Sequence, residues 1–222
     1  MQAIFETVFD AAYLLTVLLI GIRMLWSSHG VRIFQLFGAM AIVLGAGDAF
    51  HLIPRAIALC TTGLSSYTVT LGIGKMITSV TMTVFYILLY CVWRARYDVK
   101  GRDGYTAAIA VLAAIRIALC LMPQNGWTSA TPSLAWGVFR NIPFTIMGIL
   151  IVGLFYRSAK KRTDMAFRRM WLTIVISFAC YLPVVLFADR FAWVGFLMIP
   201  KTLAYVWTVL IGYRAMRNEA AG

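Results

Sequence analysis

Charged side chains are scarce in this sequence, which excludes most soluble folds. Asp, Glu, Lys and Arg together make up 13% of the 222 residues, whereas soluble domains contain about 25%. Apolar residues make up 62%, and the mean hydropathy is +0.84. The composition therefore predicts an all-α, polytopic membrane protein rather than a water-soluble domain.

Motifs for common enzyme, metal and cofactor chemistry are also missing. The sequence contains no HExxH, no GxSxG and no glycine-rich phosphate loop. It has two histidines, and its four cysteines lack CxxC or metal-ligand spacing. We therefore expect no metal and no cofactor. We interpret the cysteines as free thiols, with a Cys60–Cys120 disulfide as the alternative.

Acidic residues are few, 8 against 20 Lys and Arg, and the formal net charge is +12. Such an excess can indicate a nucleic-acid partner, but most of these cations lie in short connections between apolar runs. There they set membrane topology, so we expect no nucleic acid as a partner. They also suit anionic head groups, and membrane lipid is an expected partner. Glu6 and Asp10 stand where a cleavable signal carries Lys or Arg, so no such signal is expected.

Seven apolar runs are long enough to cross a hydrocarbon core of about 30 Å. They cover residues 3–26, 33–54, 68–93, 105–122, 137–156, 169–188 and 195–214. Most Lys and Arg outside the runs lie after the first, third, fifth and seventh; the other connections hold only Arg55 and Arg190. The positive-inside rule then places the N-terminus outside and the C-terminus in the cytoplasm. The prediction is one seven-helix domain, residues 1–222, multi-pass in the cell inner (plasma) membrane.

Weak internal similarity predicts a parallel repeat of three helices. LGIGKMITSV in the third run aligns Lys75 with Lys201 in LMIPKTLAYV of the seventh run. The repeats would cover residues 1–97 and 137–217, with the linker helix 105–122 between them. This 3+1+3 plan resembles the superfamily of SWEET and PQ-loop carriers and rhodopsins. The resemblance implies a site between two three-helix units that move against each other.

Two further resemblances concern single stretches. Gly47-Asp48 followed by Pro54 is similar to a Gly-Asp…Pro stretch of bacterial lysoplasmalogenase-type membrane hydrolases, although the acids expected in later helices are absent. This resemblance implies a lipid-modifying enzyme. Lys201 in the last run invites comparison with the retinal lysine of microbial rhodopsins. Leu197 stands where those proteins carry an acid, so retinal is not expected.

Ionisable groups inside the runs fall in the outward half of the membrane under this topology, apart from Arg23, which lies near the inner end of the first run and can snorkel to the interface. An acid at the centre of a membrane helix costs about 2.5–3.5 kcal/mol on insertion scales, so such groups turn toward protein or water. We predict that they converge on one polar chamber that opens to the exterior, extended by polar neighbours such as Asn141 and Ser177. The predicted ligand-binding residues are Asp10, Asp48, His51, Lys75, Arg116, Arg140, Tyr181, Lys201 and Tyr205.

Cations outnumber acids in this chamber, and surplus positive charge in a low dielectric attracts an anion. We therefore predict a small-solute transporter or permease for an anionic or zwitterionic molecule, with Asp10, Asp48 and His51 gating or coupling protons. A ligand-binding membrane receptor or sensor is one alternative. An intramembrane lipid-modifying enzyme that uses Asp48 and His51 as acid and base is another, although we favour a function other than catalysis. Internal ion pairs that only fix helix packing are the third.

Overall fold

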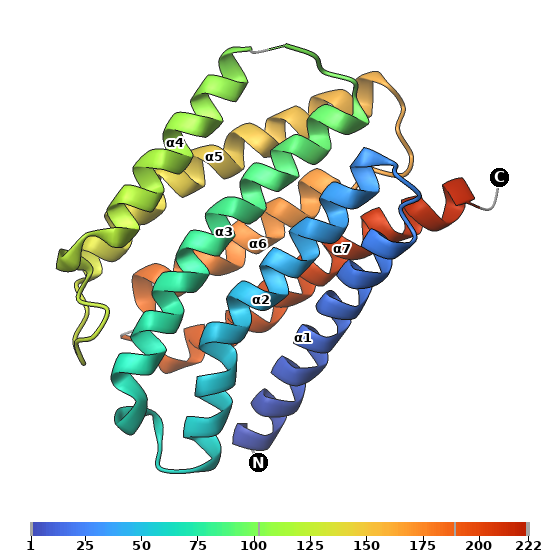
Figure 1. Cartoon of the computed structure of the whole chain (residues 1–222). Helices are drawn as coiled ribbons and strands as arrows, with labels where there is room; N and C mark the ends of the chain where they lie inside the picture. Colours follow the sequence, from blue (N-terminus) through green and yellow to red (C-terminus); the bar gives the residue numbers. More distant parts are fainter. Residues whose placement is uncertain (1, 102, 189, 221–222) are drawn as a thin grey trace.

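The computed structural model describes residues 2–101, 103–188 and 190–220, and those residues form helices and connections without a strand (Figure 1). Within them, seven helices are long and apolar enough to cross a membrane, as predicted. They are α1 (Gln2–Trp26), α2 (Arg32–Cys60), α3 (Thr68–Arg96), α4 (Gly104–Leu121), α5 (Leu134–Lys161), α6 (Met170–Phe187) and α7 (Met198–Ala220). Three connections contain the 3-10 helices η1 (Leu64–Tyr67), η2 (Pro123–Asn125) and η3 (Ala192–Leu197). The four cysteines are free thiols.

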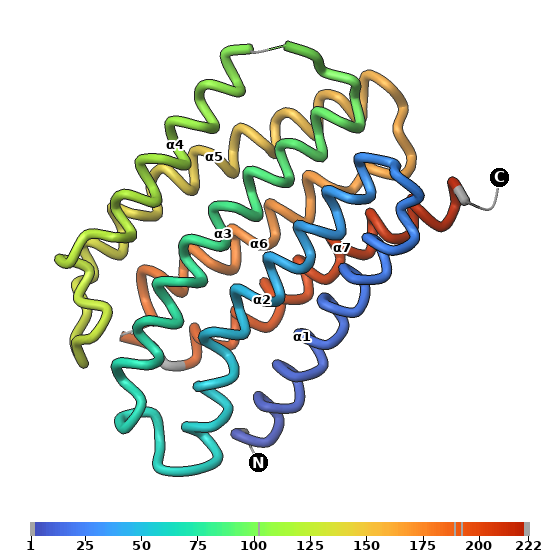
Figure 2. The backbone as a smooth tube through the Cα atoms, in the orientation of Figure 1, coloured from blue at the N-terminus to red at the C-terminus, as the bar shows by residue number. Residues whose placement is uncertain are grey.

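The seven helices lie side by side in one bundle, which the tube trace shows most simply (Figure 2). Each helix packs against its neighbours in the chain, and α7 packs against α1, so the helices form a closed ring. Contacts of α2 with α7 and of α3 with α5 cross the ring. Fully buried side chains such as Phe37, Phe85, Leu89 and Met147 fill its centre. The predicted repeat of residues 1–97 and 137–217 stays a prediction.

Prolines inside the spans do not end the helices. The predicted second span stops at residue 54, but α2 continues through Pro54 to Cys60. Proline removes one backbone hydrogen bond, but neighbouring helices and local adjustments satisfy the freed groups in a membrane. Pro143 and Pro183 likewise lie inside α5 and α6. Pro200 lies in the first turn of α7, where the backbone N–H groups lack helical partners in any case.

Glycines bring α2 and α3 unusually close at the Gly47-Asp48 stretch. A Cβ added to Gly47 would lie 2.6 Å from Cβ of Thr81, and one added to Gly74 would lie 2.8 Å from Cα of His51. The Thr78 hydroxyl donates a hydrogen bond to the Gly47 carbonyl at 3.0 Å. Gly47 therefore has a packing role, because it lets α3 approach the helix that carries Asp48.

We expect Gly74→Ala to lower the melting temperature in detergent by about 2–10 °C. Its methyl group would overlap the α2 backbone, which cannot rotate away, and overpacking of this kind costs about 1–3 kcal/mol. Gly153→Ala is the matched control, because no atom lies within 4 Å of a Cβ added there. Equal melting temperatures for the two variants would contradict the close approach of α2 and α3.

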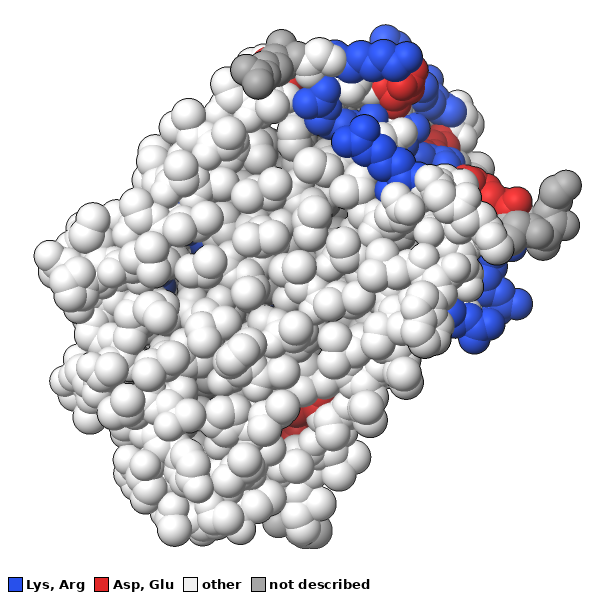
Figure 3. Space-filling view, in the orientation of Figure 1, with Lys and Arg blue, Asp and Glu red and all other residues white. Residues whose placement is uncertain are grey.

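The two ends of the bundle differ in charge. Figure 3 shows Lys and Arg gathered over the α3–α4 connection, the α5–α6 connection and the C-terminal turn, while the rest of that face carries almost none. We call this the basic end; its connections are residues 27–31, 97–103 and 162–169, of which Arg102 lies outside the described residues. The opposite end contains residues 61–67, 122–133, 188 and 190–197. Basic and non-basic connections, which alternate along the sequence, therefore lie at opposite ends of the bundle.

Candidate functional site

All nine predicted ligand-binding residues lie in the half of their helices that is farther from the basic end. Acids are on α1 and α2, the arginines are on α4 and α5, and Lys201 on α7 lies near Asp48. Eight side chains, linked by contacts or by the influence of one charge on another, form a group that we call the charge cluster. Its members are Asp10, Tyr13, Asp48, Arg116, Asn141, Tyr181, Lys201 and Tyr205.

Asp48 is held by a tyrosine rather than by a direct ion pair. The Tyr13 hydroxyl donates a hydrogen bond to Asp48 Oδ2 at 2.7 Å. Lys201 lies close enough for its charge to act on Asp48, but no ion pair within 4.0 Å joins the two among the described residues. Asp10, one turn from Tyr13 on α1, also acts electrostatically on this carboxylate. Two acids and one lysine therefore share this corner of the cluster.

Lys201 is buried among aromatic rings. Its side chain is 8% exposed, and Nζ lies 5.1 Å from the ring centroid of Tyr181 and 5.3 Å from that of Tyr205. An ammonium has three N–H donors, and none of them donates a hydrogen bond to a described residue. Cation–π contacts of this kind stabilise a desolvated ammonium by about 2 kcal/mol. The donors of Lys201 are therefore available to a ligand.

Arg116 is the most unusual residue of the cluster. It is 1% exposed, and its guanidinium carbon lies 3.3 Å from the ring centroid of Phe144. Nη1 donates to Asn141 Oδ1 at 3.4 Å, while Nε is buried without a partner. No described Asp or Glu forms an ion pair with it. A buried cation with unused donors is costly unless an anion joins it.

Tyr181 connects the lysine to the arginine. Its ring lies under Lys201, and its hydroxyl donates to Asn141 Oδ1 at 3.0 Å, the same oxygen that Arg116 contacts. Asn141 Nδ2 donates to the Gly137 carbonyl at 2.8 Å, which fixes the orientation of the amide. Lys201 and Arg116 are therefore the two cations at either end of one short polar path.

Three predicted residues lie at the edge of the cluster. Arg140 Nη1 donates to Asn125 Oδ1 at 2.8 Å, and its guanidinium lies 4.3 Å from the ring centroid of Trp127. His51 Nδ1 lies 3.3 Å from the carbonyl oxygen of Leu71. Lys75 is exposed and acts electrostatically on His51. Among the described residues, no hydrogen bond joins Asp48 to His51.

Four contact residues were not predicted from the sequence: Tyr13, Asn125, Trp127 and Phe144. Tyr13 carried a usable signal, since it is polar and lies three residues after Asp10 on the same helix face. Asn125 and Trp127 come from a connection whose conformation the sequence does not specify. Phe144 is apolar, and nothing in the pattern distinguishes it from the other core aromatics.

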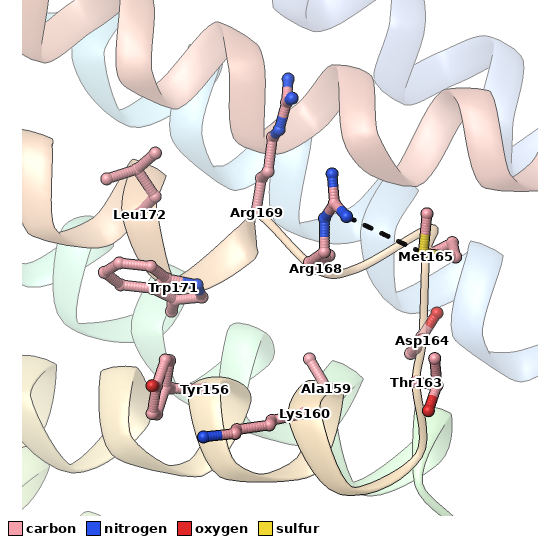
Figure 4. Close-up of a pocket in the computed structure, with 10 residues that line it drawn as sticks. All are labelled: Tyr156, Ala159, Lys160, Thr163, Asp164, Met165, Arg168, Arg169, Trp171 and Leu172. Atoms are coloured by element: carbon pink, nitrogen blue, oxygen red, sulfur yellow. Dashed lines mark hydrogen bonds between the residues drawn. The ribbon is translucent and has the colours of Figure 1, made fainter.

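Two open surface cavities of the described structure lie at the basic end, away from the charge cluster. One, of about 450 Å³, lies between the end of α5 and the start of α6 (Figure 4). The other, of about 500 Å³, includes Arg96, Tyr97 and Arg162 in its lining. Neither is lined by a predicted ligand-binding residue. The chamber predicted from the sequence is therefore neither of these cavities, and aromatic rings cover the cations of the cluster.

An ion pair at the basic end ties three segments together. Arg96 donates to both carboxylate oxygens of Asp164, at 2.9 and 3.0 Å, and to Glu219 at 3.1 Å. Burial alone would raise the pKa of Asp164, but the hydrogen bonds and the charge of Arg96 hold that pKa below its ordinary value. The connection between α5 and α6 is thus fastened to α3 and α7.

Asp164→Asn is expected to reduce stability at pH 7 by about 1–2 kcal/mol, because Asn cannot form this ion pair. Since the pKa of Asp164 is lower in the folded state, its contribution is complete above pH about 4 and is lost as pH falls through the folded pKa. The melting temperatures of Asp164→Asn and the wild type should therefore differ at pH 7 and converge in acid. Asp98→Asn is the control, because Asp98 forms only an exposed pair with Lys100. If the difference in melting temperature between Asp164→Asn and the wild type stayed constant with pH, the ion pair would not be its cause.

Comparison of the chain with protein-family models, with curated proteins and with solved structures finds no match. Function is therefore inferred from the charge cluster and its contacts. Within it, Arg116 and Lys201 have unused donors, and Asp48 supplies the opposite charge nearby. This arrangement suits a small molecule with an anionic group.

Proposed function

We propose that the protein is a small-solute transporter whose substrate is anionic or zwitterionic. The observation that carries this proposal is Arg116, a buried cation with an unpartnered Nε and no described carboxylate partner. A substrate carboxylate or phosphate bound at Arg116 and Lys201 supplies the missing charge. Arg140, which also pairs with no described acid, adds positive potential at the edge of the cluster.

The acids of the cluster give the proposed site a second function. Asp48 lies near Lys201 and is held by Tyr13, so it is placed to receive a substrate ammonium or a proton. Asp10 is close enough to influence it. Ionisable groups inside membrane spans commonly form proton relays. Substrate binding at the cations and protonation at Asp48 are therefore proposed to be coupled.

The covered cations correspond to a closed state in this proposal. Transport then requires one part of the bundle to move against another so that the site opens to each side in turn. Pro143 in α5 and Pro183 in α6 lie beside Asn141 and Tyr181 and remove backbone hydrogen bonds there. We propose that α5 and α6 bend at this level.

The positive-inside rule places the basic end in the cytoplasm and the opposite end outside the plasma membrane. Cys60 is exposed at the opposite end and provides a native probe for this orientation. In intact cells, a membrane-impermeant maleimide should label the wild type, and Cys60→Ser should abolish that labelling. Labelling that requires cell lysis would reverse the orientation.

Uptake into proteoliposomes tests the transport proposal. The panel contains radiolabelled inorganic phosphate, small carboxylates and amino acids, each with and without a proton gradient. We expect uptake of one of these classes, reduced to background in Lys201→Ala and unchanged in Lys100→Ala, which alters an exposed loop lysine. Absence of uptake across the panel, or normal uptake by Lys201→Ala, would refute the proposal.

The same assay separates the alternatives. A receptor would bind an anion at the same residues without moving it into the vesicle. A lipid-modifying enzyme needs Asp48 and His51 to act together, but the Asp48 carboxylate accepts from Tyr13 and His51 contacts the Leu71 carbonyl. The contacts therefore favour a binding and transport site over an acid–base pair.

A further inference from the structure

The cavity between α5 and α6 has an apolar wall that is open to its surroundings. The rings of Tyr156 and Trp171 meet edge to face with centroids 5.4 Å apart, and Leu172 lies beside them in the lining. Tyr156 is 46% exposed and Met165 is 68% exposed. The volume of about 450 Å³ is that of a small-ligand site. The wall therefore offers an apolar surface to a ligand.

Three cations border the same cavity: Lys160, Arg168 and Arg169. Figure 4 shows Lys160 extending along α5 toward Tyr156, and both arginines projecting from the connection away from α5. None of the three forms an ion pair with a described acid. Asp164, the acid in the lining, already accepts hydrogen bonds from Arg96 on both oxygens. The net potential at the cavity is therefore positive.

The cavity lies at the ends of two helices, which is the level of the lipid head groups. It lies where α5 ends at Lys161 and α6 begins at Met170. The ends of two spans meet the lipid head groups, and Trp and Tyr are the residues that favour this level. An occupant there meets water at the cations and hydrocarbon at the aromatic wall.

We propose that this cavity binds an anionic phospholipid. Its phosphate lies in the positive potential of Lys160, Arg168 and Arg169, which border the cavity from different sides, while the glycerol and the first acyl carbons lie on Tyr156 and Trp171. Basic pockets between membrane helices suit such head groups. A zwitterionic lipid carries a cation that opposes the three side chains, and free phosphate leaves the apolar wall uncovered. This inference does not depend on the transport proposal.

Native mass spectrometry of the purified protein tests this site with phosphatidylglycerol and phosphatidylcholine of identical acyl chains. We expect phosphatidylglycerol to bind about tenfold more tightly, and the variant Lys160→Gln/Arg168→Gln/Arg169→Gln to lose that preference. The matched control is Lys100→Gln/Arg214→Gln/Arg217→Gln, which removes the same charge from the basic end but not from the cavity lining. Trp171→Leu keeps all the cations and should weaken phosphatidylglycerol binding severalfold.

Three results would overturn the site. An equal loss of the preference for phosphatidylglycerol in both triple variants would show that the total charge of the basic end, rather than this cavity, attracts the lipid. Unchanged preference in the cavity variant would place the lipid elsewhere. Displacement of the lipid by glycerol 3-phosphate at equal concentration would indicate a site for soluble phosphate. Melting curves of each variant confirm that the protein is folded.

Discussion

Arg116→Met is expected to abolish anion uptake while leaving the protein at least as stable as the wild type. Methionine has a similar length and removes a buried charge with an unpartnered Nε. Replacing buried charges with apolar side chains is often neutral or stabilising. Losing one partner of a buried charge pair with the substrate costs about 2–5 kcal/mol, or at least 30-fold in binding. Uptake in proteoliposomes and the melting temperature are both measured.

The combination of the two readouts makes this prediction decisive. A purely structural Arg116 would give lower stability together with a general loss of function. A residue that binds the substrate gives unchanged or higher stability with lost uptake. Arg157→Met is the control, since it makes the same substitution at an exposed position on α5. Normal uptake by Arg116→Met would remove Arg116 from the site.

Asp48→Asn is expected to reduce uptake at least 30-fold and to remove its dependence on the proton gradient. The amide has nearly the same shape, and its oxygen can still accept the hydrogen bond from Tyr13. The substitution therefore removes the charge near Lys201 and the titrating group, with little change in packing. Uptake is measured with and without a proton gradient.

Two further variants define the role of Asp48. Tyr13→Phe removes only the hydroxyl that holds the carboxylate, so it should reduce uptake less than Asp48→Asn while keeping the dependence on protons. Asp98→Asn changes an exposed acid of the basic end and should transport normally. Proton-dependent uptake at the wild-type rate in Asp48→Asn would show that coupling resides elsewhere.

Hydropathy predicted all seven spans, because a run of apolar residues must cross the membrane as a helix. It did not predict the helix ends, because α5 begins at Leu134, capped by Ser133, and continues through charged residues to Lys161. Hydropathy reports the hydrocarbon layer, whereas helices extend into the head-group region. The continuation of α2 past Pro54 was also missed, since it depends on packing rather than on local propensity.

The charge cluster was predictable in part, because lipid penalises exposed charges. The cost of exposing Arg116 and Lys201 to lipid forces both inward, and Tyr181 lies at the same level, so their convergence follows from topology. The hydrogen-bond partners of these side chains do not follow from topology. Asp48 accepts from Tyr13, and Arg140 donates to Asn125 in a connection. These contacts depend on helix rotation and loop conformation, which a single sequence does not fix.

The presence of an anion site in the charge cluster is tested most directly by thermal shifts in detergent with phosphate, small carboxylates and amino acids. We expect at least one of these compounds to raise the melting temperature of the wild type and of Arg157→Met by several degrees. The same compound should leave Arg116→Met unchanged. An equal shift in Arg116→Met, or no shift of the wild type with any compound, would contradict the site.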